Sequence, residues 1–147
     1  MKSINKFNMT VLSYSANEYF VRAAVSAFLT QLDPTIEELN DVKTAVSEAV
    51  TNCIVHAYKD SIGKIYITAE LFDNNSIRIK IRDKGCGIEN VEQAMQPLFT
   101  TVGGERAGLG FAVMQSFTDN VRVRSSLSKG TVVTLTKQLN VRVSING

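Results

Sequence analysis

Two polar side chains, Glu48 and Asn52, stand four residues apart in a largely apolar stretch of the chain. On an α-helix this spacing puts both on one face. Asparagine is a poor helix former, and a polar group in a buried segment needs a partner. The amide oxygen of Asn52 could therefore hold Mg²⁺, while the Glu48 carboxylate accepts a proton from a nucleophile. A solvated helix face is the alternative for this spacing taken alone, and His56, on the same face, is expected to be structural.

Asp83 follows an alternating strand pattern and precedes two glycines, Gly85 and Gly87. Glycine permits backbone angles and close approaches that a side chain would forbid. An ordinary strand-to-loop turn is sufficient to explain such a sequence. In the functional interpretation, Asp83 accepts a hydrogen bond from an exocyclic amine, such as that of adenine, and the ring lies against the glycine backbone.

The segment Gly108-Leu109-Gly110 immediately precedes an apolar helical run. Backbone N–H groups at a helix N-terminus attract phosphate oxygens, which makes this segment a candidate phosphate cradle. A plain glycine-rich loop before a helix is the alternative, and no Gly-Lys-Ser/Thr follows, so the segment is not a P-loop. Upstream, Thr100 and Thr101 lie in a loop of small residues that could close over a nucleotide, and Arg106 could reach a terminal phosphate.

The hydrophobic periodicity predicts a two-layer α+β sandwich. Alternating patterns predict strands around residues 7–11, 65–71, 77–82, 121–123 and 133–135, with hairpin turns at residues 73–75 and 129–130. Apolar stripes predict helices up to about residue 30, from Asp33-Pro34 to near Tyr58, and from about residue 108 to 117. Asp33 before Pro34 is typical of a helix N-cap. We expect a mixed, mostly antiparallel sheet covered by helices on one face.

A single domain over residues 1–137 is expected, followed by a C-terminal tail or edge strand at 138–147. A net charge of +2, with no stretch in which basic residues gather, gives no reason to expect direct contact with nucleic acid. No apolar run reaches the roughly 20 residues of a membrane helix, and the first residues do not resemble a signal peptide.

The cysteines and the histidine bear on location and metal choice. Cys53 and Cys86 are far apart and predicted to be unpaired, which suits a reducing cytoplasm. Two cysteines and one histidine do not favour a zinc site. Any metal should therefore be a hard cation held by oxygen atoms.

Together and in this order, the motifs resemble those of the GHKL ATPase superfamily, whose ATP-binding domain has the Bergerat fold. The N-box is similar to residues 48–52 with His56, the two glycine boxes to residues 83–87 and 108–110, and the closing box to residues 130–135. In that box, Thr131 would support the adenine-binding Asp83. The resemblance implies that these motifs bind ATP or ADP with Mg²⁺.

Within the superfamily, the chain resembles the anti-sigma factor serine kinases of the sporulation anti-sigma F type, through residues 31–35, 46–52 and 96–101. This implies a homodimer that binds a sigma factor of the sigma F type. It also implies transfer of the γ-phosphate of ATP to a serine of an anti-anti-sigma factor, which is thereby inactivated. Ala57 replaces a glycine common in the family, and the lid segment Val102–Glu105 is shorter and richer in glycine.

The expected mechanism has adenine on Asp83, phosphates at residues 108–110, Mg²⁺ on Asn52 and Glu48 as the general base. A GHKL ATPase switch, in which Glu48 activates water and no protein acceptor is used, is the main alternative. A histidine-kinase catalytic domain would need a phosphoacceptor histidine on a separate helical domain, whereas His56 lies in the N-box helix. Intact Glu48 and Asn52 disfavour a non-catalytic binding module.

Overall fold

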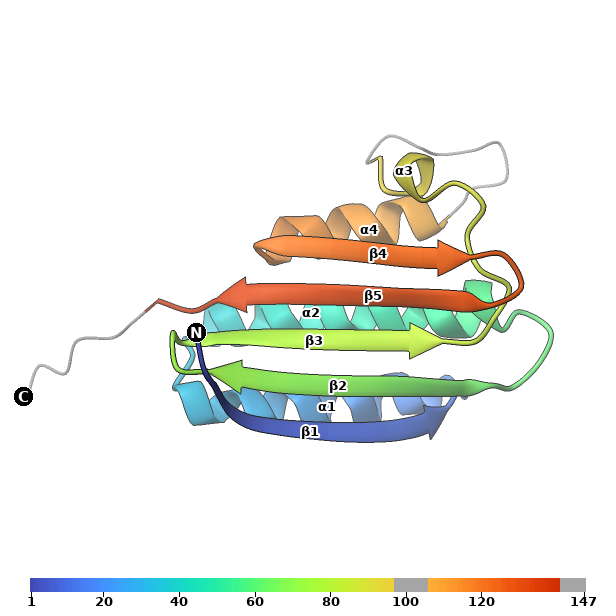
Figure 1. The fold of residues 1–147 in the computed structure, drawn as a ribbon. Coiled ribbons are helices and arrows are strands. Elements are labelled where there is room, and N and C mark those ends of the chain that lie inside the picture. Colours follow the sequence, from blue (N-terminus) through green and yellow to red (C-terminus); the bar gives the residue numbers. More distant parts are fainter. Residues whose placement is uncertain (97–105, 141–147) are drawn as a thin grey trace, which may run out of the picture.

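A five-stranded antiparallel sheet forms one layer of the protein (Figure 1). The computed structural model describes residues 1–96 and 106–140, without the side chains of residues 106–109. The strand order is β1-β2-β3-β5-β4, and every pairing among these strands is antiparallel. The strands are β1 (Ser3–Leu12), β2 (Lys64–Phe72), β3 (Ser76–Asp83), β4 (Asn120–Ser126) and β5 (Gly130–Gln138).

Tight hairpins join β2 to β3 and β4 to β5, as the sequence predicted. In the first hairpin Asn75 has φ 65°, a left-handed conformation that asparagine tolerates in turns. The register pairs Phe72 with Ser76 beside the turn and Ile65 with Asp83 at the far end. Because side chains alternate across a strand, the isoleucines of both strands are buried on the same face of the sheet.

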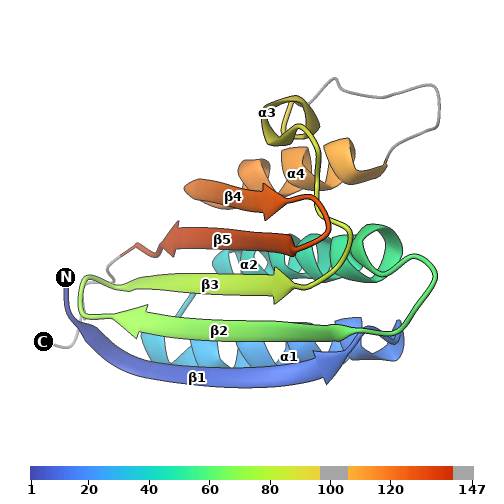
Figure 2. The same cartoon turned by 45° about the vertical axis from the view of Figure 1, so that its right-hand side comes forward.

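Three helices cover that face and leave the other face of the sheet open (Figure 2). They are α1 (Ala16–Leu29), α2 (Ile36–Asn52) and α4 (Arg106–Phe117). The middle helix, α2, packs against both α1 and α4. Val46 of α2 and Phe111 and Met114 of α4 are almost fully buried in the core between the layers. The predicted two-layer α+β architecture is confirmed.

The start of α2 differs from the sequence prediction. Asp33 is not the N-cap, since it follows a short 3₁₀ turn, η1 (Thr30–Leu32), with φ 52°. Thr35 caps the helix: its hydroxyl accepts the N–H of Glu38 at 3.0 Å, and the Glu38 carboxylate accepts the N–H of Thr35 at 2.9 Å. This reciprocal capping box satisfies two backbone N–H groups, those of Thr35 and Glu38. A simple aspartate N-cap would lack the second of these bonds, the one that returns from the glutamate to the cap residue.

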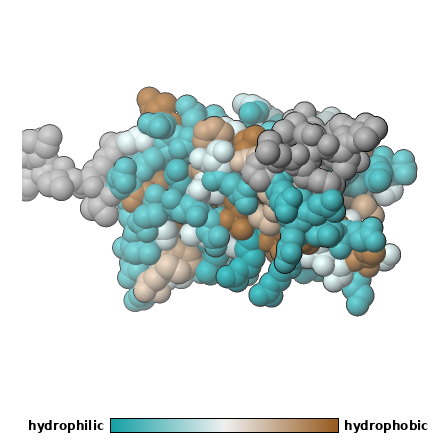
Figure 3. Space-filling view, turned by 90° about the horizontal axis from the view of Figure 1, so that it is seen from above, coloured by the Kyte–Doolittle hydropathy of each residue, from teal (hydrophilic) through white to brown (hydrophobic). Residues whose placement is uncertain are grey.

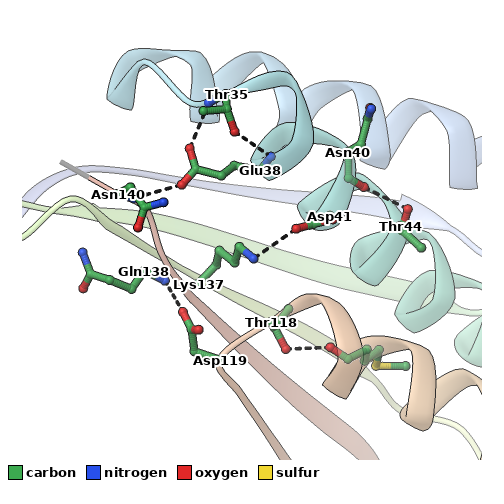
Figure 4. A network of polar contacts seen from close by, with 11 residues as sticks. Thr35, Glu38, Asn40, Asp41, Thr44, Thr118, Asp119, Lys137, Gln138 and Asn140 are labelled. Atoms are coloured by element: carbon green, nitrogen blue, oxygen red, sulfur yellow. Dashed lines mark hydrogen bonds and ion pairs between the residues drawn. The ribbon is translucent and has the colours of Figure 1, made fainter. Parts of the chain in front are cut away.

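Polar contacts tie the start of α2 to the end of β5 (Figure 4). Lys137 Nζ lies 3.2 Å from a carboxylate oxygen of Asp41, and the N–H of Asn140 donates to Glu38 at 2.9 Å. Leu139, between them in sequence, is 1% exposed. The first residues of the predicted tail thus pack on the domain, while residues 141–147 lie outside the described residues.

The connection from β3 to α4 contains a further helical turn, α3 (Val91–Ala94), in a stretch for which the sequence predicted no helix or strand. The Asn90 side chain caps this turn by accepting the N–H of Gln93 at 3.0 Å. The predicted lid segment, Val102–Glu105, lies outside the described residues.

The described surface is mostly hydrophilic when seen from above, and hydrophobic residues form separate spots there (Figure 3). Large exposed apolar side chains include Tyr19 and Phe20 on α1 and Ile36 at the start of α2. In the described ranges, no helix has both the length and the apolar character that crossing a membrane would require.

Candidate functional site

A pocket lies between the end of α2, the end of β3, α4 and β5. Part of its wall is η2 (Cys53–Ala57), a π-helical turn that continues α2 and ends before Tyr58, as predicted for this helix. Its empty volume, open mouth included, is about 440 Å³. The lining residues are Ala49, Asn52, Cys53, His56, Ala57, Asp83, Cys86, Gly87, Ile88, Phe111, Thr131 and Val133. The fold therefore brings residues of the N-box, the first glycine box and the closing box together.

Asp83 is a buried carboxylate in the wall of this pocket. Its Oδ1 accepts the N–H of Gly85 at 2.9 Å and the N–H of Thr131 at 3.2 Å. Thr131 is the register partner of Asp83 on β5, and its hydroxyl pairs with the Ser125 hydroxyl at 2.8 Å. The backbone of Thr131, and not its hydroxyl, thus holds the carboxylate in place.

Cys53 is a second support of Asp83 that the sequence analysis missed. Its buried thiol donates to Asp83 Oδ2 at a sulfur–oxygen distance of 3.5 Å. Burial raises the pKa of the Asp83 carboxyl above its ordinary value, although hydrogen bonds from Gly85, Cys53 and Thr131 partly offset that shift. Burial likewise raises the pKa of the Cys53 thiol well above its ordinary value. The position of Cys53 directly after Asn52 is the signal that could have pointed to it.

The Asn52 amide has no hydrogen-bond partner among the described residues, although both its Oδ1 and its Nδ2 are buried. Such a state is costly, and a bound ligand would relieve it. Gly110 of α4 lies over this amide, since a Cβ at that glycine would be 3.1 Å from Asn52 Oδ1 and 3.4 Å from Glu48 Oε2. The close approach of α4 to α2 therefore needs glycine at residue 110, and it brings Glu48 and Asn52 to one point.

Glu48 itself lines a second, polar hollow and is not part of the first pocket's lining. The other residues of that hollow are Arg22 of α1 and Asn40, Lys43, Thr44 and Ser47 of α2. Glu48 consequently stands between the pocket that holds Asn52 and a hollow on the side of α1. A second reactant could reach the carboxylate from this hollow without passing through the pocket.

Gly87 is required by the path of the chain after β3. It has φ 78°, and a Cβ there would lie 2.2 Å from the carbonyl oxygen of Ser126. The same loop is bound to the β4–β5 hairpin, since the N–H of Ile88 donates to the Ser125 hydroxyl at 2.7 Å. Hairpin packing thus explains glycine at residue 87, and the predicted contact of a ligand ring with Gly85 and Gly87 stays a prediction.

Helix α4 begins at Arg106, two residues earlier than predicted. Gly108 thus falls in its first turn, where N–H groups have no acceptor within the helix, whereas Leu109 and Gly110 are its fourth and fifth residues, from which N–H groups ordinarily bond four residues back. The phosphate cradle at residues 108–110 therefore stays a prediction, and Gly110 serves helix packing. The structure does not describe the side chains of Arg106 and Leu109. Thr100 and Thr101 lie outside the described residues.

The histidine kinase-like ATPase domain matches residues 15–137 of this chain. The anti-sigma F factor of Caldanaerobacter subterraneus subsp. tengcongensis is 56% identical over 140 residues, which cover 95% of this chain and 97% of that protein. The chain belongs to the histidine kinase-like ATPase family, in the group of the anti-sigma F factors. Anti-sigma F factors of Clostridium beijerinckii and Priestia megaterium are 51% and 47% identical, over 95% and 92% of this chain and 98% and 93% of their own lengths.

Solved structures agree on the fold. The RsbU and RsbW domains of Rv1364c from Mycobacterium tuberculosis superpose with a TM-score of 0.68 at 22% identity, over 92% of this chain and 33% of that one. The histidine kinase domain of the Erythrobacter litoralis EL346 blue-light activated histidine kinase gives a TM-score of 0.55 at 19% identity, over 83% and 61%. These structures confirm the fold, while the resemblance to the GHKL superfamily is confirmed by the match to the histidine kinase-like ATPase domain.

Membership of this ATPase family makes the chain an ATP-binding domain. The pocket offers a suitable group for the adenine and another for the phosphate end of that ligand. The buried Asp83 carboxylate suits an adenine amine, because a hydrogen bond to a charged acceptor is stronger than one between neutral groups. The buried Asn52 amide suits a metal or phosphate group. In the described part of the chain, no group of three or more His, Cys, Asp or Glu side chains could hold a metal ion alone.

Proposed function

We propose that this chain is an anti-sigma factor that inhibits a sigma factor of the sigma F type and is also an ATP-dependent protein serine kinase. Its substrate is an anti-anti-sigma factor, which phosphorylation inactivates. The regulatory role is supported by the similarity to anti-sigma F factors, which are 56% and 51% identical to this chain over nearly its full length. The observation that carries the kinase role is the convergence of Glu48 and Asn52 on Gly110, between the pocket and the polar hollow.

The nucleotide lies in the pocket with its adenine amine donating to Asp83 Oδ2. The start of α4 around Gly108–Gly110 faces its phosphates with the positive end of the helix dipole, with Arg106, Thr100 and Thr101 as further contacts. The Asn52 amide oxygen would hold Mg²⁺, since this cation usually takes only one or two ligands from the protein and the rest from water and the substrate phosphates. When bound, Mg²⁺ neutralises charge on the phosphates.

Glu48 is the general base of this proposal. The acceptor serine enters by the polar hollow, and its hydroxyl proton passes to the Glu48 carboxylate. The serine oxygen forms a bond to the γ-phosphorus as the bond from that phosphorus to the β-bridging oxygen breaks, and ADP leaves. A positioned base contributes about 10²–10⁴-fold to such a step.

Labelled ATP tests this proposal directly. The protein is incubated with γ-labelled ATP, Mg²⁺ and a candidate anti-anti-sigma factor, and the label on each protein is counted. We expect Glu48→Gln to lower transfer by about 10²–10⁴-fold while nucleotide affinity, measured by calorimetry, is kept. The matched control is Glu37→Gln, an exposed residue in the first turn of the same helix.

The outcome also separates the two candidate activities. Normal transfer by Glu48→Gln would exclude the base role. Release of free phosphate at the same rate with and without acceptor would instead support a hydrolytic ATPase switch in which Glu48 activates water. Co-elution with a sigma F type factor in the presence of ATP or ADP tests the anti-sigma role, and sedimentation tests the homodimer that the family resemblance implies.

A further inference from the structure

The open face of the sheet carries most of the positive charge of the chain. Along β3, Arg78, Lys80 and Arg82 face outward, because the isoleucines between them are buried under the helices. More than half of the 16 lysines and arginines belong to this face, which Figure 1 shows from the front. They are Lys6, Lys64, Arg78, Lys80, Arg82, Lys84, Arg122, Arg124 and Lys129. Glu70 is the single carboxylate at the outward positions of the five described strands.

The strand register lines these cations up with hydrogen-bonding side chains. One row across the sheet is Asn8, Thr68, Lys80, Thr134 and Arg122, and the next is Thr10, Tyr66, Arg82, Val132 and Arg124. Opposite residues on neighbouring strands are about 5 Å apart, and alternate residues along one strand about 6.6 Å apart. The result is a flat grid of ammonium, guanidinium and hydroxyl groups.

The positive charge of this grid is poorly compensated. Arg78 pairs with Glu70 at 3.0 Å, and Arg82 and Lys84 lie over the Tyr66 ring. Within the described ranges, no carboxylate forms an ion pair with Arg122, Arg124 or Lys129. Arg82, Arg124 and Lys129 also surround a shallow hollow over Val132. The overall charge of only +2 therefore conceals a molecule with one strongly basic face.

We propose that this basic face binds the phosphate backbone of nucleic acid, independently of the kinase and anti-sigma roles. Arginine, lysine and threonine side chains are the usual partners of phosphates in such complexes. A protein partner fits less well, because interface centres favour aromatic anchors and are poor in lysine. Here the centre holds Lys80 between threonines, whereas the large exposed apolar residues Leu12 and Leu127 lie at the end of β1 and in the turn between β4 and β5.

The sequence did not predict this basic face, or contact with nucleic acid, because the lysines and arginines are spread along the chain. The basic residues occur at alternate positions of separate strands, so that even the most basic stretch, residues 78–84, supplies only four of them and is interrupted by isoleucines and Asp83. Only the pairing of those strands places them side by side. Binding to a phosphate backbone depends on how the cations are arranged on the protein surface and not on their order along the chain.

Salt-dependent binding of labelled DNA tests the proposal. Fluorescence anisotropy with a duplex of arbitrary sequence should show binding that weakens steeply between about 50 and 200 mM salt. The variant Arg122→Ser/Arg124→Ser should flatten the slope of log K against log salt by about 1.8, since each lost phosphate contact removes about 0.9. The matched control, Arg22→Ser/Lys43→Ser, removes the same charge from the helical layer and should leave that slope unchanged.

Three results would overturn the proposal: no binding at low salt, equal losses in both double variants, or competition by poly-glutamate as effective as that by DNA. The last result would assign the face to an acidic protein. Single-stranded DNA in a parallel titration identifies the preferred form of the backbone, with a smaller slope change of about 0.7 per contact. Unchanged ATP affinity shows that the edge-strand variant is folded, and Lys80→Ser on β3 provides a second test of the same surface.

Discussion

The two sides of strand β3 have opposite chemistry within a single run of residues. Toward the helices it presents isoleucines and then Asp83, all almost fully buried. Toward solvent it presents Arg78, Lys80 and Arg82. On the buried side one carboxylate is held by Gly85, Thr131 and Cys53 at fixed distances, whereas on the open side many cations act together with few defined contacts.

This difference shows how burial decides what a charged residue can do. A buried charge interacts strongly because little water screens it, so a single residue can determine the affinity for a ligand. Exposed charges are screened over about 10 Å, so they act as a sum and respond to salt. The pocket is therefore expected to be sensitive to single substitutions and the basic face to be sensitive mainly to their number.

Neighbouring substitutions on β3 give the largest contrast between the two sides. Ile79→Ala should lower the free energy of unfolding by about 2–5 kcal/mol, because it leaves a cavity in the core. Lys80→Ala, one residue on, should change it by less than about 0.5 kcal/mol. Urea unfolding of both variants measures the difference, and similar losses in the two would show that the open face is covered in solution.

Asp83→Asn should weaken ATP and ADP alike by about tenfold to 150-fold, since a hydrogen bond to a charged group contributes about 1.5–3 kcal/mol. Asp60→Asn, an exposed aspartate after η2, is the control. Calorimetric titration with both nucleotides gives the affinities. Unchanged affinity in Asp83→Asn would remove this residue from the nucleotide site.

Although Asp83→Asn should weaken nucleotide binding, it should stabilise the folded protein in the absence of ligand. Burial raises the pKa of Asp83 in the folded state, so the folded state binds more protons than the unfolded state between the ordinary and the raised pKa. Stability contributed by this group therefore falls as pH rises through that window. Asp83→Asn should raise Tm at neutral pH, and the gain should shrink as the pH falls toward about 4. A gain that is constant with pH would contradict this explanation.

Gly110→Ala probes the contact between α2 and α4, with the smallest expected effect. The added Cβ would stand 3.1 Å from Asn52 Oδ1, which forces the helices apart or the amide aside. We expect a loss of about 1–3 kcal/mol in stability, as for overpacking elsewhere, together with weaker Mg²⁺-dependent nucleotide binding. Gln115→Ala, exposed on the same helix, is the control. Full Mg²⁺ dependence in Gly110→Ala would show that Asn52 is not held by this contact.

The elements of the fold were largely predictable because their patterns are local. Alternation identified the strands, and the period of 3.6 identified α2 from its start region to Tyr58. The cap of α2 was misplaced, because Asp33 and Thr35 both suit an N-cap and only the reciprocal bond with Glu38 decides between them. The start of α4 was predicted two residues late, because glycine at 108 and 110 suggested a loop, whereas glycine at 110 is needed for the close approach of α4 to α2.

The sequence by itself determined which chemistry the chain carries: an acid and an amide one turn apart, an aspartate at a strand end, and the family to which they belong. Only the tertiary structure decided how these groups meet. The register of β3 with β5 places the N–H of Thr131 within hydrogen-bond distance of Asp83, and the approach of α4 to α2 places Gly110 against the Asn52 amide. It also gathered scattered lysines and arginines into one basic face, because a sheet brings opposite residues of neighbouring strands within about 5 Å of each other.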